Sequence, residues 1–328
     1  MSIEGHEGGR LLGYRHVAIA QRLSMVPVEQ IITEHDGLGE ALGAISRPAP
    51  PLSLPRYHRP GRSFAAPLST KIGPMPPRPP PDYGPRARVG IATPQANPTV
   101  EPEIRALLPA AIGVYATRLV HPAAQVEDRL HHYVRHMADA VRSFGSLQLR
   151  AFGFGCTGSS YLAGRELEDR LSDEAAAEAR IPVITAAQAI RFTLRALGVR
   201  SIALVSPYPE TLAAAGYRYW EDAGLRIVAR RRVDPALTDT HRIYELGSDD
   251  ALQALRRLDT AGAEALVASG TGMPTLRALR SLRNETSLPV LSSNLCLAWA
   301  LLRTVAPELA PASPMELLGD SAAESGAA

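Results

Sequence analysis

The stretch Ala151-Phe-Gly-Phe-Gly-Cys-Thr-Gly-Ser-Ser160 joins an apolar run to a small, polar, glycine-containing turn. A helix-like segment follows it at residues 161–171. A strand that enters a turn at a helix start exposes backbone N–H groups, which create a positive field. Cys156 stands in this turn, so the sequence predicts a reactive thiol with a lowered pKa. The alternative is that Cys156 is a small buried hydrophobe, as free cysteines usually are.

Strand-like and helix-like segments alternate on both sides of this turn. The first part of the chain is expected to hold strands at residues 88–94, 113–118, 149–155 and 181–185, and helices at 99–108, 126–144 and 186–197. Short connections marked by Gly and Pro separate them. This alternation predicts an α/β fold with a mainly parallel sheet.

The same order of segments recurs later in the chain. Residues 265–272 (Ala-Leu-Val-Ala-Ser-Gly-Thr-Gly) parallel residues 151–158, and residues 288–292 parallel residues 181–185. The sequence therefore predicts two pseudo-symmetric, doubly wound, Rossmann-like halves, which span residues 86–200 and 201–307. The last helix of the first half could instead pack against the second half. Ligands of open α/β sheets bind beyond the strand ends, so the active site is expected in the cleft between the halves.

Both ends of the chain differ from this pattern. Residues 1–85 hold 14 of the 28 prolines, which predicts a mostly disordered, extended segment. Residues 308–328 are rich in Ala, Ser and Pro and are predicted to form a loose tail.

Composition excludes several classes of function. A net charge of +2 is too small to indicate a nucleic-acid partner or an anionic membrane. Two cysteines far apart in the sequence form no disulfide framework, and no run of 18 apolar residues indicates a membrane span. A cytoplasmic protein is expected. The helical face with His131, His132 and His136, near Arg129 and Arg135, is interpreted as solvated, and no metal site is expected.

The repeat aligns Cys156 of the first half with Gly270 of the second. Both stand in small, polar turns that could present backbone donors to one anion. Pro94 and Asn97, after the first strand, and Tyr208, at the equivalent place in the second half, are expected to line the same cleft.

Other cysteine chemistries lack their residues. A phosphatase loop needs an arginine where the chain has Leu162, and a nucleophile elbow needs a glycine where it has Phe154. No second thiol completes a redox pair with Cys156.

At this point a family resemblance becomes specific. The chain resembles the aspartate/glutamate racemase superfamily, and within it the maleate isomerase and arylmalonate decarboxylase branch. The matching stretches are residues 93–103, 155–159, 207–208, 269–274, 291–294 and 297–299. The resemblance implies a cofactor-independent isomerase or lyase that acts beside a carboxylate of a small acid.

The resemblance also assigns roles to residues, and here the chain departs from the family. Racemases of the superfamily use two cysteines on opposite faces of the substrate; Cys156 matches the first, but Gly270 stands at the second position. Decarboxylases of the branch use one cysteine, in the second half, so the mirror arrangement here implies a product of opposite handedness. Cys296 lies in an apolar helix and is expected to be core.

A mechanism consistent with these residues is a hypothesis for the site. Backbone N–H groups of the two turns, with Tyr208, bind a carboxylate, while Asn97 orients a second polar group. Cys156 then protonates a planar intermediate or adds to a double bond. The predicted catalytic positions are Cys156, Gly270 and Tyr208, and the predicted substrate-binding residues are Pro94, Asn97, Thr157, Gly158, Ser269, Thr271, Gly272 and Asn294.

Several alternatives stay open from the sequence. His241 and Tyr244 are expected in a surface loop, with capping of the cleft as the other interpretation. Asn294 is either cleft-lining or turn-forming. Two alternatives to an isomerase or decarboxylase remain: an amino-acid or hydantoin racemase with a non-standard second base, and a non-catalytic small-acid-binding protein. A homodimer or higher oligomer is possible.

Overall fold

The computed structural model describes residues 80–319. The prediction of a disordered segment over residues 1–85 falls almost entirely outside this range, as do residues 320–328. No helix in the described range is long and apolar enough to cross a membrane.

The first half is a four-stranded parallel sheet in the order β2-β1-β3-β4. Its strands are β1 (Ala87–Pro94), β2 (Ile112–Leu119), β3 (Ala151–Phe154) and β4 (Val183–Thr185). Its helices are α1 (Val100–Leu107), α2 (Val126–Arg135), α3 (Met137–Arg142), α4 (Thr157–Ala163), α5 (Arg165–Ala179) and α6 (Ala186–Ala196).

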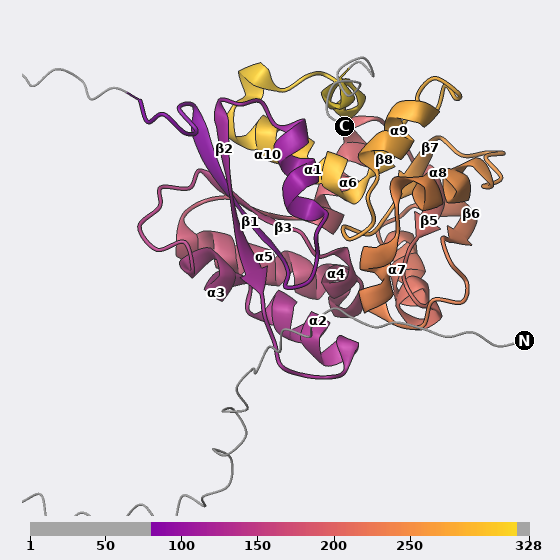
Figure 1. The fold of residues 1–328 in the computed structure, drawn as a ribbon, viewed down its shortest axis with the longest axis horizontal. Helices are drawn as coiled ribbons and strands as arrows, with labels where there is room; N and C mark the ends of the chain where they lie inside the picture. The colour runs from indigo at the N-terminus through magenta and orange to yellow at the C-terminus, as the bar shows by residue number, and fades with distance from the viewer. Residues whose placement is uncertain (1–79, 320–328) are drawn as a thin grey trace, which may run out of the picture. The chain divides into compact units, whose positions relative to one another are not determined.

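The second half repeats this order with four new strands, β6-β5-β7-β8, again all parallel. The strands are β5 (Ser201–Ser206), β6 (Arg226–Arg232), β7 (Ala265–Ala268) and β8 (Val290–Ser292). The helices are α7 (Glu210–Asp222), the 3₁₀ helix η2 (Thr240–Glu245), α8 (Ser248–Arg256), α9 (Leu276–Leu282) and α10 (Ser293–Val305), followed by the 3₁₀ helices η3 (Pro307–Leu309) and η4 (Pro314–Leu318). Two α/β halves of one topology confirm the predicted fold, and Figure 1 shows them from indigo to pink and from salmon to yellow.

The central strands are buried along almost their whole length because helices cover both faces of each sheet. Residues 89–94 of β1 include Val89 and Ile91, which are fully buried, and β5 is buried at every position. Parallel sheets produce such continuous apolar runs. The edge strand β6 is half-exposed and carries arginines instead.

Each sheet reverses its strand order beside its first strand, and these two reversal points position the site. The N–H of Gly155, just after β3, donates to the carbonyl of Ala92 in β1 at 2.7 Å. The N–H of Ser269, just after β7, donates to the carbonyl of Val205 in β5 at 2.9 Å. The loops that leave these four strands therefore start at equivalent places in the two halves, where open α/β sheets bind ligands.

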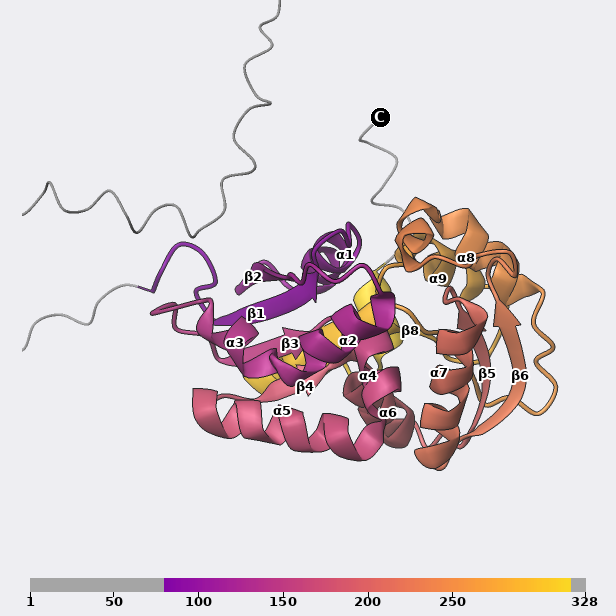
Figure 2. The same ribbon diagram turned by 90° about the horizontal axis from the view of Figure 1, so that it is seen from below.

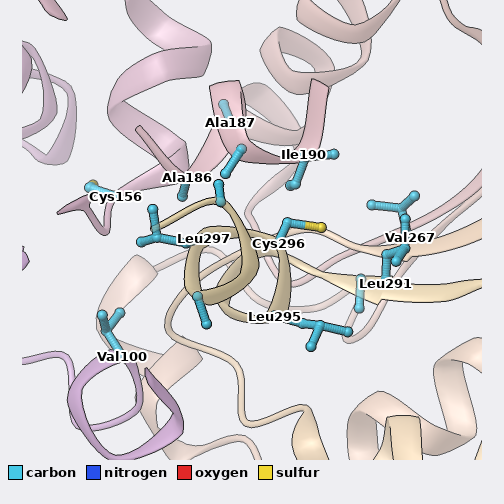
Figure 3. Close-up of a cluster of buried hydrophobic side chains, with 14 of the residues drawn as sticks. Val100, Cys156, Ala186, Ala187, Ile190, Val267, Leu291, Leu295, Cys296 and Leu297 are labelled. Atoms are coloured by element: carbon cyan, nitrogen blue, oxygen red, sulfur yellow. The ribbon is translucent and has the colours of Figure 1, made fainter. Parts of the chain in front are cut away.

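The helix α10 follows the second sheet but packs against β3, β4 and α1 of the first half, and against α6. Gly153 of β3 permits this approach, since a Cβ there would lie 3.1 Å from Leu301 Cδ1. Figure 3 shows Cys296 on α10 beside Ala187 and Ile190 of α6. Cys296 is fully buried, and burial raises the pKa of its thiol to about 12, so the expectation of a core residue is confirmed.

Three expected segments differ in the structure. The predicted helix over residues 126–144 is two helices, since the backbone leaves helical geometry at His136 (φ −105°, ψ 29°). The helix after Cys156 begins at Thr157, earlier than expected, and Gly164 (φ +73°) separates α4 from α5.

The third difference lies at the carboxyl end. Residues 308–319, predicted as part of a loose tail, belong to an ordered segment that contains η3 and η4 and packs on α10 and α9. Trp299 Nε1 donates to the Pro311 carbonyl at 3.0 Å, and Arg280 Nε donates to the Leu318 carbonyl at 2.8 Å. The side chain of Leu318 is buried, which composition alone does not indicate.

Candidate active site

A small cavity of about 50 Å³ lies where the loops of the two halves meet. Both halves contribute to its wall, as the repeat predicted, and Figure 2 shows α4 of the first half between α2 of the same half and α7 of the second. The lining residues are Pro94, Gln95, Ala96, Asn97, Val126, Arg129, Leu130, Tyr133, Cys156, Gly158, Tyr208, Leu212, Thr240, His241, Ile243, Tyr244, Thr271 and Gly272.

Cys156 caps the start of α4 and lies in this wall with 3% of its surface exposed. Its Sγ lies 3.1 Å from Ser159 Oγ. Burial raises the pKa of the Cys156 thiol, and hydrogen bonds from Ser159 and from the Gly158 backbone N–H only partly oppose this effect. The predicted lowering of its pKa is therefore wrong in this structure, because desolvation outweighs the N–H groups of the turn.

The hydrogen bonds around the sulfur still matter for chemistry. The backbone N–H groups of Gly158 and Ser159 and the Ser159 hydroxyl are fixed donors that stabilise a thiolate once it forms. Cys156 is thus a protonated thiol at neutral pH whose conjugate base already has three hydrogen-bond donors.

Gly270 has no room for a side chain. Its φ is +146°, and a Cβ there would lie 2.5 Å from Pro207 Cγ and 2.7 Å from Pro207 Cδ. Its N–H donates to Ser293 Oγ at 2.9 Å. A second cysteine at this position would require both a strained backbone and a displaced Pro207.

The turn after Gly270 holds two backbone N–H groups that are not used within residues 80–319. Thr271 and Gly272 line the cavity, and their N–H groups have no hydrogen-bond partner in the described part of the chain. The side chain of Thr271 is committed elsewhere, since its Oγ1 donates to the Gly155 carbonyl at 2.9 Å. Paired N–H groups in a turn are a common cradle for a carboxylate oxygen.

Three tyrosines share the cavity wall with the cysteine. Burial raises the pKa of Tyr133, Tyr208 and Tyr244, and the nearby Cys156 raises each of them further. All three phenols are therefore protonated at neutral pH and can donate a hydrogen bond. The sequence singled out Tyr208 alone as catalytic.

Asn97 offers the cavity one group. Its Oδ1 accepts the N–H of Thr99 at 2.8 Å and that of Val100 at 3.3 Å, at the start of α1. Its Nδ2 has no partner among residues 80–319, so it is the atom that Asn97 can present to a ligand.

Four predicted site residues lie outside the wall and instead hold it together. Thr157 Oγ1 donates to Ser293 Oγ at 3.2 Å, and the Ser269 hydroxyl bonds to the Tyr161 hydroxyl. Gly270 is backbone support, as described above. Asn294 lies within α10, so it neither lines the cleft nor forms a turn.

A buried carboxylate that the sequence did not reveal joins the two halves. Glu103 of α1 accepts the N–H of Leu276 at 3.0 Å, at the start of α9, and Asn294 Nδ2 donates to it at 2.7 Å. Burial raises the pKa of Glu103 and these hydrogen bonds oppose the rise. Nearby, Thr99 Oγ1 donates to the Gly272 carbonyl at 2.9 Å. These bonds fix α1 against the turn that carries the backbone donors.

Two further lining groups were misassigned from the sequence. The 3₁₀ helix η2 places His241 and Tyr244 in the wall, and Tyr244 packs so closely on Gly272 that a Cβ there would lie 2.8 Å from Tyr244 Cε1. Capping of the cleft is therefore the correct interpretation of this loop. Arg129, interpreted as part of a solvated face, also lines the cavity.

Known proteins resemble this chain along most of its described length. The family model described as arylmalonate decarboxylase matches residues 89–318. Maleate isomerase from Nocardia farcinica is 28% identical over 252 residues, which cover 72% of this chain and 97% of that protein.

Solved structures share the fold. A variant of the Nocardia farcinica maleate cis-trans isomerase with a covalently bound succinylcysteine intermediate superposes with a TM-score of 0.63 at 24% identity, covering 72% of this chain and 99% of the other. An arylmalonate decarboxylase structure gives a TM-score of 0.57 at 20% identity, covering 67% and 92%. These relatives are an isomerase and a lyase, which confirms the expected branch and enzyme class. With the family model matching well over half of its length, the chain belongs to the arylmalonate decarboxylase family.

Proposed function

We propose that this protein is a cofactor-independent isomerase or decarboxylase that acts on a small dicarboxylate or malonate-type acid, with Cys156 as its one reacting cysteine. The observation that carries the proposal is that Cys156 lines a cavity to which both halves contribute, while the aligned position in the second half, Gly270, has no room for a second thiol. The unpaired cysteines also support the reducing cytoplasm as its location.

The chemistry that suits a protonated thiol is proton donation. A carboxylate of the substrate binds the N–H groups of Thr271 and Gly272 and the Tyr208 hydroxyl, which stabilise the charge of an enediolate better than that of the starting acid. In a decarboxylation, the bond to the second carboxylate breaks, CO₂ leaves, and the electron pair enters the enediolate.

The enediolate carbon then takes the proton of Cys156. The C–H bond forms as the S–H bond breaks, and the thiolate that remains is held by the N–H groups of Gly158 and Ser159 and by the Ser159 hydroxyl. A proton from water restores the thiol. Because the raised pKa keeps the proton on sulfur until the enediolate forms, the state of Cys156 favours this role over that of a preformed nucleophile.

Cis–trans isomerisation is the second candidate, supported by the maleate isomerase relatives and by the succinylcysteine intermediate of one of them. In that reaction a thiolate of Cys156 adds to the double bond, the new single bond rotates, and expulsion of the thiolate gives the trans acid. The thiol must first lose its proton, which burial opposes.

The test is a panel of maleate, alkylmalonates and arylmalonates followed by NMR in deuterated water. We expect turnover of one class by the unaltered protein and by Cys296→Ala, and loss of turnover in Cys156→Ala. Full activity of Cys156→Ala, with its fold intact by circular dichroism, would overturn the proposal.

A further inference from the structure

Arg129 is the one Arg or Lys among the lining residues that the structure describes. It stands in the first turns of α2, one turn before Tyr133, which lines the same cavity. The proposed chemistry, which uses Cys156, Tyr208 and the backbone donors, leaves this cation without a role.

The guanidinium is fixed in place yet only partly used. Its Nη1 donates to the carbonyls of Ala123 at 2.8 Å and Ala124 at 2.7 Å, in the loop before α2. Within residues 80–319, Nε and Nη2 have no hydrogen-bond partner, and no carboxylate forms an ion pair with Arg129. A guanidinium anchored through one nitrogen keeps the rest of its donor fork for a planar acceptor.

The surroundings favour an anion at this place. No Asp or Glu occurs among the lining residues, while Tyr133 and Tyr244 flank the cation closely enough that its charge acts against the burial-raised pKa of both phenols. Contacts with His241 are the main causes of the lowered pKa of Asp239, to which the charge of Arg129 also contributes slightly. The Asp239 Oδ1 accepts the His241 N–H at 2.9 Å and lies 3.1 Å from His241 Nδ1. The Asp239 carboxylate is thus committed to its own loop.

We propose that Arg129 binds a second carboxylate of the substrate, one that the reaction leaves in place, and so selects dianionic over monoanionic acids. The inference rests on the isomerisation candidate of the proposed function, in which the first carboxylate occupies the donors beside Cys156 and the second stays on the product. A carboxylate that departs as CO₂ is a poor candidate for Arg129, since a cation that stabilises it in the bound acid raises the barrier to its loss.

The test compares binding of succinate and monomethyl succinate, which differ by one negative charge, by calorimetry on the Cys156→Ala protein at fixed ionic strength. We expect succinate to bind at least about tenfold tighter, as one charged hydrogen-bonded contact provides. Arg129→Gln should reduce this ratio to below about threefold and leave monomethyl succinate binding unchanged. Arg135→Gln, which removes an exposed cation from the same helix, should keep the full ratio.

The outcomes separate this inference from the proposed function. If Arg129→Gln retains the succinate preference, or loses affinity equally for both ligands, Arg129 does not read the second charge and the inference is wrong. If neither ligand binds the Cys156→Ala protein with Arg129 present, the inference and the isomerisation candidate are both wrong, while decarboxylation of a malonate is untouched. Loss or retention of turnover on Cys156→Ala bears on the proposed function alone.

Discussion

The exclusion of a side chain at position 270 is open to a stability measurement. Gly270→Ala places a Cβ where Pro207 Cγ and Cδ lie 2.5 and 2.7 Å away, on a backbone with φ +146°. We assign about 1–3 kcal/mol to the backbone strain and about 1–3 kcal/mol to overpacking. The loss of unfolding free energy should therefore be about 2–6 kcal/mol, a fall in Tm of roughly 5–20 °C.

Gly262→Ala provides the matched control, because Gly262 has φ +75° and no atom of residues 80–319 lies within 4 Å of the added Cβ. It should show the backbone cost alone, about 1–2 kcal/mol. Pro207→Ala removes both atoms that the new Cβ meets. In a double-mutant cycle by urea denaturation, we expect Pro207→Ala and Gly270→Ala to couple favourably by about 1–3 kcal/mol. Equal losses in Gly270→Ala and Gly262→Ala, with no coupling to Pro207, would refute the reasoning.

Three further perturbations follow from the same geometry. Because burial raises the pKa of Cys156 above its usual value, the thiolate fraction, and with it the rate of iodoacetamide alkylation followed by mass spectrometry, should rise about tenfold per unit from pH 7 to pH 9; a plateau below pH 8 would contradict this. Glu103→Ala leaves the donors of α9 and Asn294 without an acceptor, so it should lower the free energy of unfolding, measured by urea denaturation, by about 2–4 kcal/mol. Glu101→Ala, which removes only half-exposed ion pairs, should lower it by less than about 1 kcal/mol. Similar losses in the two variants would argue against the buried contact. Tyr208→Phe should lower kcat/KM about 10- to 100-fold through the lost hydroxyl donor, and the exposed Tyr83→Phe should not change it; an unaltered rate in Tyr208→Phe would remove Tyr208 from the site.

The fold could be predicted from the sequence because parallel strands that are buried on both faces have continuous apolar sequences. The correspondence of residues 265–272 with residues 151–158 aligned Cys156 with Gly270, and each lies two residues beyond its strand in the structure. The breaks between helices were harder to predict. Histidine does not break helices, so nothing in the sequence indicates that α2 ends at His136, and α2 and α3 were predicted as one helix.

The composition of the cavity wall was harder to predict, because it depends on how the halves pack. The periodicity of α2 shows which side faces its own sheet, but not that Arg129 and Tyr133 line one cavity together with η2 of the other half. The prediction of a lowered pKa for Cys156 was wrong for a related reason. The N–H donors were foreseen from the turn, whereas the burial that outweighs them comes from side chains distant in sequence.

The central claim is that one cysteine acts from one face of the substrate. Its most direct measurement is the stereochemistry of deuterium incorporation when a prochiral disubstituted malonate is decarboxylated in deuterated water. We predict one deuterium, a single product enantiomer of handedness opposite to that from arylmalonate decarboxylase, and no product from Cys156→Ala. A racemic product, or an unchanged product from Cys156→Ala, would contradict the account.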